Sequence, residues 1–164
     1  MSKTATVCVS TVVEVDPQEA FRIFTEEVDL WWKRSPRFRQ SSDPKGTMRF
    51  EPGEGGRLIE IADDLEDGQY EFGKVLVWKP AERLCFEFRA RANAIGEESE
   101  VDVVFEKTAN GTRITIVQTG WEDLPSDHPV RHGLDEDAFN TMLAVFWGDL
   151  LSSARVFAAE ANVR

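Results

Sequence analysis

The sequence predicts an α+β domain in which a curved, seven-stranded antiparallel sheet wraps around a long C-terminal helix, with two short helices after the first strand (β-α-α-β6-α). One observation is a series of six short segments between residues 46 and 119, rich in β-branched and aromatic residues and separated by turn signals. The other is a helical pattern of apolar residues over 135–161. Because the strands are joined by short turns, we expect them to pair antiparallel. One helix cannot cover seven flat strands, so the sheet is expected to curl around it.

The N-terminal part of the chain supplies the first strand and the two short helices. Residues 4–14 alternate and are rich in Val and Thr, which predicts a strand. Asp16 suits a helix N-cap and Pro17 suits the first helical position, so a short helix is expected to begin there. A second short helix is predicted over 26–32, and the Pro- and Ser-containing stretch 33–45 is predicted to be a loop.

The six remaining strands follow as a meander. Asn110-Gly111 between the last two is a strong signal for a two-residue hairpin. The turns before them contain Gly or Pro residues that favour a chain reversal. The predicted strands are 46–51, 57–62, 69–79, 83–90, 99–107 and 112–119.

Alternation within the strands predicts which side chains face the helix. In the strand 69–79 the alternation is broken, because Phe72, Leu76 and Trp78 share one face while Val75 and Val77 share the other. A bulge at Gly73 would reconcile the two, and the sequence leaves the inward parity of this strand open. The inward residues of the last three strands are predicted to be Leu84, Phe86, Phe88, Val101, Val103, Phe105, Ile114, Ile116 and Gln118.

The final helix carries an apolar stripe at three- and four-residue steps. A helix held against a curled sheet leaves room for an apolar cavity between the two, and such pockets bind small molecules. The stripe comprises Phe139, Met142, Leu143, Phe146, Leu150, Ala154, Phe157 and Ala161. The residues predicted to line the cavity are Trp31, Trp32, Phe38, Phe72, Trp78, Phe86, Phe88, Val103, Phe105, Ile116, Gln118, Met142, Phe146 and Asp149.

Two of these predictions have a structural alternative. Trp31 and Trp32 are adjacent, and neighbouring helical residues point about 100° apart, so at most one should face the cavity squarely. Both could instead serve as an apolar plug that fastens the short helices to the sheet. Asp149 would be a polar anchor if it pointed into the cavity, but we favour a position on the flank of the helix.

Charge and composition exclude several classes of protein. The net charge of −11 argues against binding to nucleic acid or to anionic membranes, because both need a cationic protein surface. No apolar run approaches the roughly 20 residues of a membrane-spanning segment, so no membrane insertion is expected. The N-terminus shows no hydrophobic signal segment, so we expect a cytoplasmic protein in which Cys8 and Cys85 are free thiols.

Three segments of the chain resemble a known family. They are FTEEVDLWWKRSPRF, GKVLVWKPAERLCFEF and GTRITIVQTGWEDL, and they contain Gly73-x-Val75, Trp78-x-Pro80 and Thr119-Gly120-Trp121-Glu122. Together they resemble the activator-of-heat-shock-protein-ATPase-like branch of the START-like (SRPBCC) superfamily. The resemblance implies a single START-like domain over residues 1–164, with a helix-grip fold and an apolar ligand cavity. It implies no shared catalytic residues, and it raises a chaperone as a partner.

The sequence contains no recognised catalytic motif. No Gly-rich phosphate loop and no Gly-x-Ser-x-Gly elbow is present. His128 and His132, together with Asp127 and Asp135, could in principle bind a metal, but loop histidines are more often exposed or capping. We therefore expect neither a metal nor a cofactor.

Three functions stay open at this stage. We prefer a binding module that encloses a small apolar molecule as a carrier or sensor. The second is a cyclase- or lyase-type enzyme, which needs an acid–base group in the cavity, and the candidates are His132, Asp149 and Tyr70. The third is a protein-interaction domain whose acidic surface binds a partner such as a chaperone. A homodimer formed through exposed aromatic positions is compatible with each of them.

Overall fold

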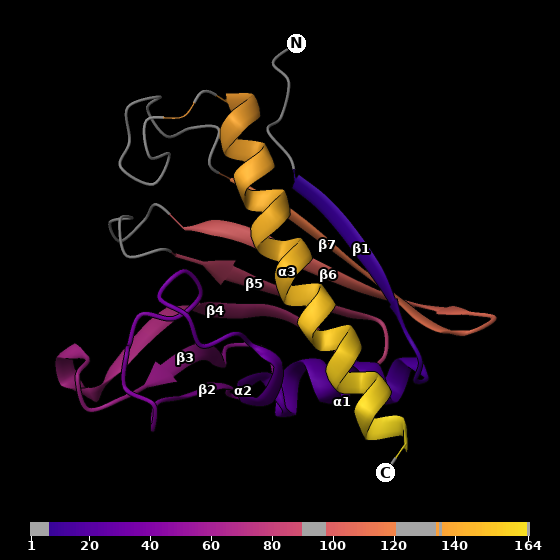
Figure 1. Cartoon of the computed structure of the whole chain (residues 1–164), viewed down its shortest axis with the longest axis horizontal. Coiled ribbons are helices and arrows are strands. Elements are labelled where there is room, and N and C mark those ends of the chain that lie inside the picture. Colours follow the sequence, from indigo (N-terminus) through magenta and orange to yellow (C-terminus); the bar gives the residue numbers. More distant parts are fainter. Residues whose placement is uncertain (1–6, 90–97, 121–133, 135, 164) are drawn as a thin grey trace.

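The computed structural model describes residues 7–89, 98–120, 134 and 136–163, and its order of elements confirms the prediction (Figure 1). A short 3-10 helix, η1, is the one addition among these residues. The elements are β1 (Val7–Val13), α1 (Pro17–Glu26), α2 (Val28–Trp31), β2 (Thr47–Phe50), β3 (Arg57–Ile61), η1 (Glu66–Gly68), β4 (Gln69–Lys79), β5 (Arg83–Phe88), β6 (Ser99–Thr108), β7 (Gly111–Thr119) and α3 (Glu136–Val163).

The seven strands form one antiparallel sheet in the order β1-β7-β6-β5-β4-β3-β2. α3 crosses one face of this sheet diagonally, as Figure 1 shows. The two edge strands are β1 and β2, and α1 and α2 connect them in sequence. The predicted caps hold α1 in place, because the Asp16 side chain accepts a hydrogen bond from the Glu19 N–H and Pro17 is the first helical residue. This is the helix-grip architecture.

The predicted inward parity of β5, β6 and β7 is confirmed. Leu84 pairs with Val103, and Val103 pairs with Ile116, so the three side chains stand in a row on the face that α3 covers. All three are completely buried. Cys8 and Cys85 are free thiols, as predicted.

The irregularity of β4 is resolved by two register shifts. One lies between Leu58 and Ile59 of β3, opposite the Gly73 region, and the other lies between Val75 and Val77. The second shift makes Leu76 an extra residue that is 39% exposed, so that Trp78 pairs with the inward-facing Leu84.

α3 buries a wider face than the predicted stripe. Trp147 and Leu151 lie at its centre and are almost completely buried, whereas Phe157 and Ala161, which belong to the predicted stripe, are only partly buried. The difference arises because α3 packs against the short helices α1 and α2 as well as against the sheet at β1. By length and composition alone, residues 137–161 would also suit a membrane-spanning helix; here the apolar face of the helix packs on the sheet.

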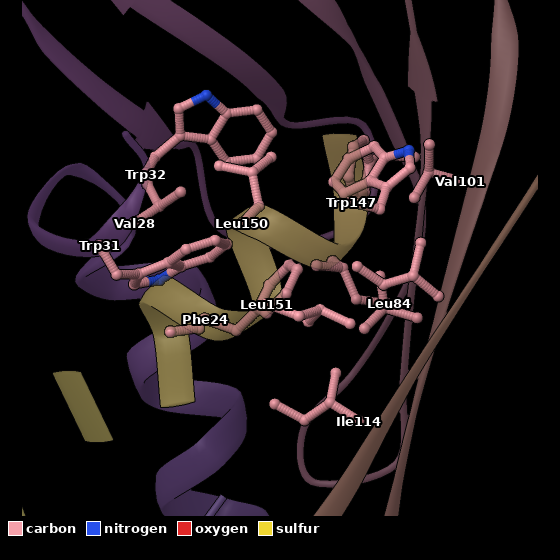
Figure 2. Close-up of a cluster of buried hydrophobic side chains, with 14 of the residues drawn as sticks. Phe24, Val28, Trp31, Trp32, Leu84, Val101, Ile114, Trp147, Leu150 and Leu151 are labelled. Atoms are coloured by element: carbon pink, nitrogen blue, oxygen red, sulfur yellow. The ribbon is translucent and has the colours of Figure 1, made fainter. Parts of the chain in front are cut away.

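Three tryptophans fill much of the space between α3 and the sheet. Trp31, Trp32 and Trp147 lie around Leu150 in Figure 2. The expectation that only one of the first two would face inward is wrong, because both are at most 2% exposed. α2 ends at Trp31 and the backbone at Trp32 is extended, so the helical angle between neighbours does not apply.

Candidate functional site

The residues predicted to line a cavity lie mainly in a packed aromatic core. Phe72 and Phe88 stack with ring centroids 5.3 Å apart, and Trp32 meets Trp147 edge-to-face at 5.8 Å. Nine of the fourteen are buried, namely Trp31, Trp32, Phe38, Phe72, Phe86, Val103, Phe105, Ile116 and Gln118. Four more, Trp78, Phe88, Met142 and Phe146, are partly buried and pack against that core.

The structure shows one small void in this interior, within the part of the chain that it describes. A void between α1, α3 and the sheet measures about 10 Å³ and is lined by residues such as Ile23, Ile114 and Ala154. That volume is about the size of one water-sized probe. The aromatic side chains predicted to surround a ligand belong to the hydrophobic core cluster.

Gln118 is a buried polar group that contacts α3 from the sheet, and its hydrogen bonds are made within the protein. Its Oε1 accepts a hydrogen bond from the Trp147 indole at 2.7 Å, and its Nε2 donates to the Ser99 hydroxyl at 2.8 Å. Ser99 in turn donates to the backbone oxygen of Phe88. Buried polar groups are normally satisfied in this way. The chain of bonds ties α3 to the strands β5, β6 and β7.

The candidate acid–base groups do not meet in the described residues. Asp149 lies on the flank of α3, where the Arg37 guanidinium donates to it at 2.7 Å. The Tyr70 hydroxyl donates to the backbone oxygen of Arg89 at 2.7 Å. His128 and His132, with the flanking Asp127 and Asp135, lie outside the described residues. Across the described part of the chain, no group of three His, Cys, Asp or Glu side chains is placed to hold a metal.

A much larger hollow lies at one end of the sheet, and we call it the α1 groove. β2 and β4 both pair antiparallel with β3, so their C-terminal ends lie at the same end of the sheet. The hollow opens between these ends and α1, and its volume is about 620 Å³. It is lined by Gln18, Glu19, Phe21, Arg22, Thr25, Glu26, Arg49, Phe50, Pro52, Trp78 and Pro80.

The floor of the α1 groove is aromatic and continuous with the core. Phe21 and Trp78 meet edge-to-face with centroids 5.3 Å apart, and Phe50 packs against Phe86 at the same distance. After the register shift at Leu76, Trp78 pairs with Leu84, lines the groove and stays partly exposed. Sequence reasoning named Trp78 but missed the groove. The signal available was a proline soon after each of two strands, Pro52 and Pro80, at ends that the sheet topology brings together.

The two arginines of the α1 groove differ in their partners. Arg22 donates to Glu19 and to Glu27, each at 2.9 Å, and the bond from Arg22 lowers the pKa of Glu19. Arg49 projects from the edge strand β2 and is exposed, and no hydrogen bond or ion pair engages it within the residues described. One side of the groove is therefore internally neutralised, while the other presents a guanidinium.

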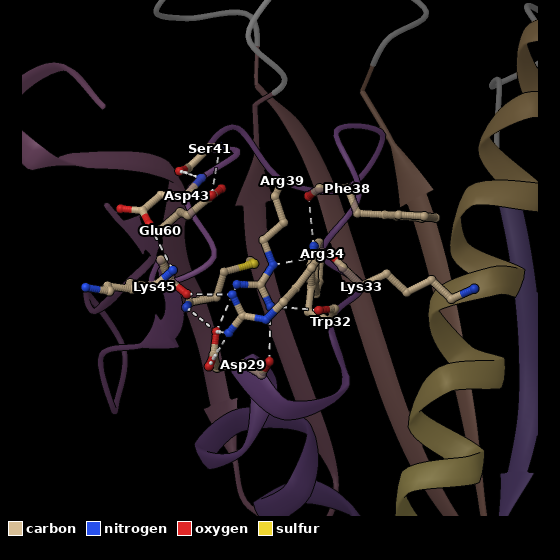
Figure 3. Close-up of polar contacts among 12 residues, drawn as sticks. Asp29, Trp32, Lys33, Arg34, Phe38, Arg39, Ser41, Asp43, Lys45 and Glu60 are labelled. Carbon is tan, nitrogen blue, oxygen red and sulfur yellow. Dashed lines mark hydrogen bonds and ion pairs between the residues drawn. The ribbon is translucent and has the colours of Figure 1, made fainter. Parts of the chain in front are cut away.

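A second, polar hollow of about 180 Å³ lies beside the loop before β2 (Figure 3). Its centre is Arg39, whose side chain is 2% exposed. Arg39 donates to the Asp29 carboxylate at 2.8 Å and to the backbone oxygens of Asp29 and Trp32 at 3.0 and 2.7 Å. Burial lowers the pKa of Arg39, and the Asp29 carboxylate opposes that shift.

Glu60 performs the matching role on the other side of this polar hollow. Its two carboxylate oxygens accept the backbone N–H groups of Gln40 and Ser41 at 2.7 and 2.9 Å. Arg39 fixes the long loop between α2 and β2 to α2, and Glu60 fixes it to β3. Because these charged groups are already engaged with protein atoms, we interpret the hollow as part of a structural cluster.

The comparison with protein families identifies the chain at the level of the family. Residues 14–144 match the family described as Activator of Hsp90 ATPase homolog 1-like protein. The chain belongs to this family. The match includes α1, both arginine-bearing walls of the α1 groove and the first part of α3. No curated protein matches the chain in sequence.

Solved structures from several bacteria share the fold of this family member. A protein from Mesorhizobium loti is 17% identical with a TM-score of 0.65, and the comparison covers 94% of this chain and 97% of that one. The AHSA1-like protein from Aeromonas hydrophila is 15% identical with a TM-score of 0.63, covering 97% and 95%. A Staphylococcus aureus protein of unknown function is 9% identical with a TM-score of 0.66, covering 99% and 98%. At these low sequence identities, the similarity shows a shared fold and nothing about function.

Proposed function

We propose that this chain is a binding module for a small apolar molecule and that the ligand lies in the α1 groove. The observation that supports this proposal is the volume of about 620 Å³ above an aromatic floor. Ligand pockets usually measure about 300–1,000 Å³ and combine an apolar lining with a few polar groups. The α1 groove has both properties.

The interior beneath α3 is a less favourable place for the same ligand. A molecule bound there would have to displace rings such as Trp32 or Trp147, which are packed and hydrogen-bonded. Removing a large aromatic side chain from a core costs about 3–5 kcal/mol, which would be lost from the binding free energy. A ligand in the α1 groove covers the part of Trp78 that is exposed and displaces no core ring.

The test is a thermal-shift screen with fatty acids, sterols, flavonoids and aromatic acids, followed by a variant that blocks the groove. A ligand at a hundredfold excess over its Kd stabilises the protein by about 2.7 kcal/mol, which is a rise of several degrees in Tm. Gln18→Trp places a ring in the groove from an exposed position of α1 and should abolish the shift. The matched control is Val156→Trp, at an exposed position of α3 outside the groove, and it should keep the shift.

Two results would contradict this assignment. One is the absence of a saturable shift across the whole panel. The other is a shift that survives in Gln18→Trp, because the ligand would then bind elsewhere.

A second candidate function is a protein-interaction domain, and an exposed apolar patch favours it. Leu30 and Val156 are 63% and 52% exposed, and both border a hollow of about 370 Å³ between α2 and α3. The family description makes an Hsp90-type chaperone the partner to test. Isothermal titration with the purified chaperone should show salt-sensitive binding that Leu30→Asp abolishes. No heat of binding at low ionic strength would reject this candidate.

A further inference from the structure

We infer that the α1 groove selects molecules with a carboxylate on an apolar body, and that Arg49 binds this carboxylate. This inference rests on the proposed function, because it names the class of ligand for the same groove.

The first step of the argument is the state of the two cations in the groove. Arg22 is held by Glu19 and Glu27 at 2.9 Å each, and Glu26 lies 4.0 Å from it. Its guanidinium is therefore engaged by the acidic side chains of its own helix. Arg49 makes no hydrogen bond or ion pair with any residue in the described part of the chain, although it lines the same groove.

The surroundings of Arg49 explain why its guanidinium stays available. Its cross-strand neighbour is Ile59, which offers no acceptor in its side chain. The nearest acid along the strand is Glu51, and Arg57 engages both oxygens of that carboxylate, each at 2.8 Å. The bond from Arg57 is also the main reason why the pKa of Glu51 is lowered, and the charge of Arg49 adds only a minor contribution.

The negative net charge of the chain makes the guanidinium of Arg49 important for the choice of ligand. With a net charge of −11, most of the surface repels an anion. A guanidinium that has no partner among the described residues and lies at the edge of an apolar groove is a local attractor, and its planar fork matches a carboxylate with two parallel hydrogen bonds. A single guanidinium suits one negative charge better than the two of a phosphate, since Glu19 and Glu26 also line the groove. The apolar body would then lie over Phe21 and Trp78.

The experiment compares matched probes that differ only in charge. 2-Naphthoic acid and 2-naphthamide have the same ring system and nearly the same size, and dodecanoic acid with dodecanamide forms an aliphatic pair. Binding is measured by isothermal titration at pH 7 and by quenching of tryptophan fluorescence. We expect at least one acid to bind about tenfold more tightly than its amide, as removal of a charge-assisted pair would predict.

Variants of Arg49 test whether this residue causes the preference for the acid over the amide. Arg49→Gln should lower the affinity for the acid about tenfold and leave the affinity for the amide unchanged, while Arg49→Lys should retain part of the preference. Arg155→Gln removes an exposed arginine from α3, outside the groove, and should change neither affinity. An unchanged Tm of Arg49→Gln shows that the fold is intact.

The outcomes separate this inference from the proposed function. If acid and amide bind equally well, or if Arg49→Gln keeps the preference for the acid, the inference is wrong while the groove remains a binding site. If neither member of either pair binds, the inference is overturned, and the proposed function is overturned with it only when the whole thermal-shift panel also gives no saturable shift.

Discussion

Replacing Arg39 by alanine should lower the free energy of unfolding by about 3–5 kcal/mol, the usual cost of breaking a buried ion pair by removing one partner. The structure supports a value in this range. The guanidinium is almost fully buried and donates to Asp29 and to two backbone oxygens at 3.0 Å or less. The variant would leave those oxygens with fewer hydrogen-bond partners. Arg39→Lys should lose less, because lysine keeps the charge but not the fork.

Arg34 provides a matched control, because it binds the same carboxylate from the surface. Its Nη2 lies 3.0 Å from the Asp29 carboxylate, but its side chain is 47% exposed. Exposed ion pairs contribute about 0–1 kcal/mol, so Arg34→Ala should lose no more than that. Each variant therefore removes an arginine that donates to Asp29, and the two arginines differ in how deeply they are buried.

The assay is urea unfolding followed by tryptophan fluorescence at pH 7, with the three proteins at the same concentration. The midpoint should fall strongly for Arg39→Ala and slightly for Arg34→Ala, with an unchanged slope m. If Arg39→Ala costs within about 1 kcal/mol of Arg34→Ala, burial does not set the strength of this cluster and the reasoning is refuted.

Three further predictions concern separate parts of the fold. Gly73→Ala should cost about 1–3 kcal/mol or more in urea unfolding, because its Cβ would lie 1.9 Å from a backbone oxygen of β5; a neutral effect would mean that the strands can separate freely. Burial raises the pKa of the Cys85 thiol to about 12, so iodoacetamide at pH 8 should alkylate the exposed Cys8 first; equal labelling in intact-protein mass spectra would contradict the buried position. The hydrogen bond from Ser41 holds the pKa of Asp64 below its usual 3.8, so this contact stabilises the fold at neutral pH and is lost as the pH falls below about 4. Ser41→Ala should therefore lose less stability than the wild type between pH 7 and pH 3, and parallel losses in urea titrations at the two pH values would reject that coupling.

The order of elements could be predicted because the signals are local. The Asp16-Pro17 cap and the Asn110-Gly111 hairpin depend on a few neighbouring residues, and strand alternation set the inward face of β5, β6 and β7. The position of the bulge in β4 could not be predicted, because it depends on how two partner strands pair with it. The buried position of Trp32 was not predicted for a related reason. α2 ends at Trp31, so the angle of about 100° between neighbouring helical residues does not apply to Trp32.

The candidate site was harder to predict than the fold. Its walls come from α1, from the end of β2 and from the end of β4, which are far apart in the sequence and meet only after the sheet has formed. Trp78 was singled out, but as a lining residue of an interior cavity and not of the α1 groove. Whether the interior is hollow depends on the volume left between α3 and the sheet, and that volume follows from side-chain packing across several elements.

The hydrogen bonds of the three buried tryptophans support the proposal that a ligand binds at the end of the sheet and not in the interior. The indole N–H groups donate to the backbone oxygens of Ile23 and Phe38 and to the side chain of Gln118, at 2.7–3.0 Å. Three acceptors on three different elements fix each ring in one orientation. Opening the interior would therefore lose directional bonds of about 1 kcal/mol each in addition to ring packing. The α1 groove opens to solvent and its aromatic floor needs no such rearrangement, so a ligand could bind there while the core stays closed.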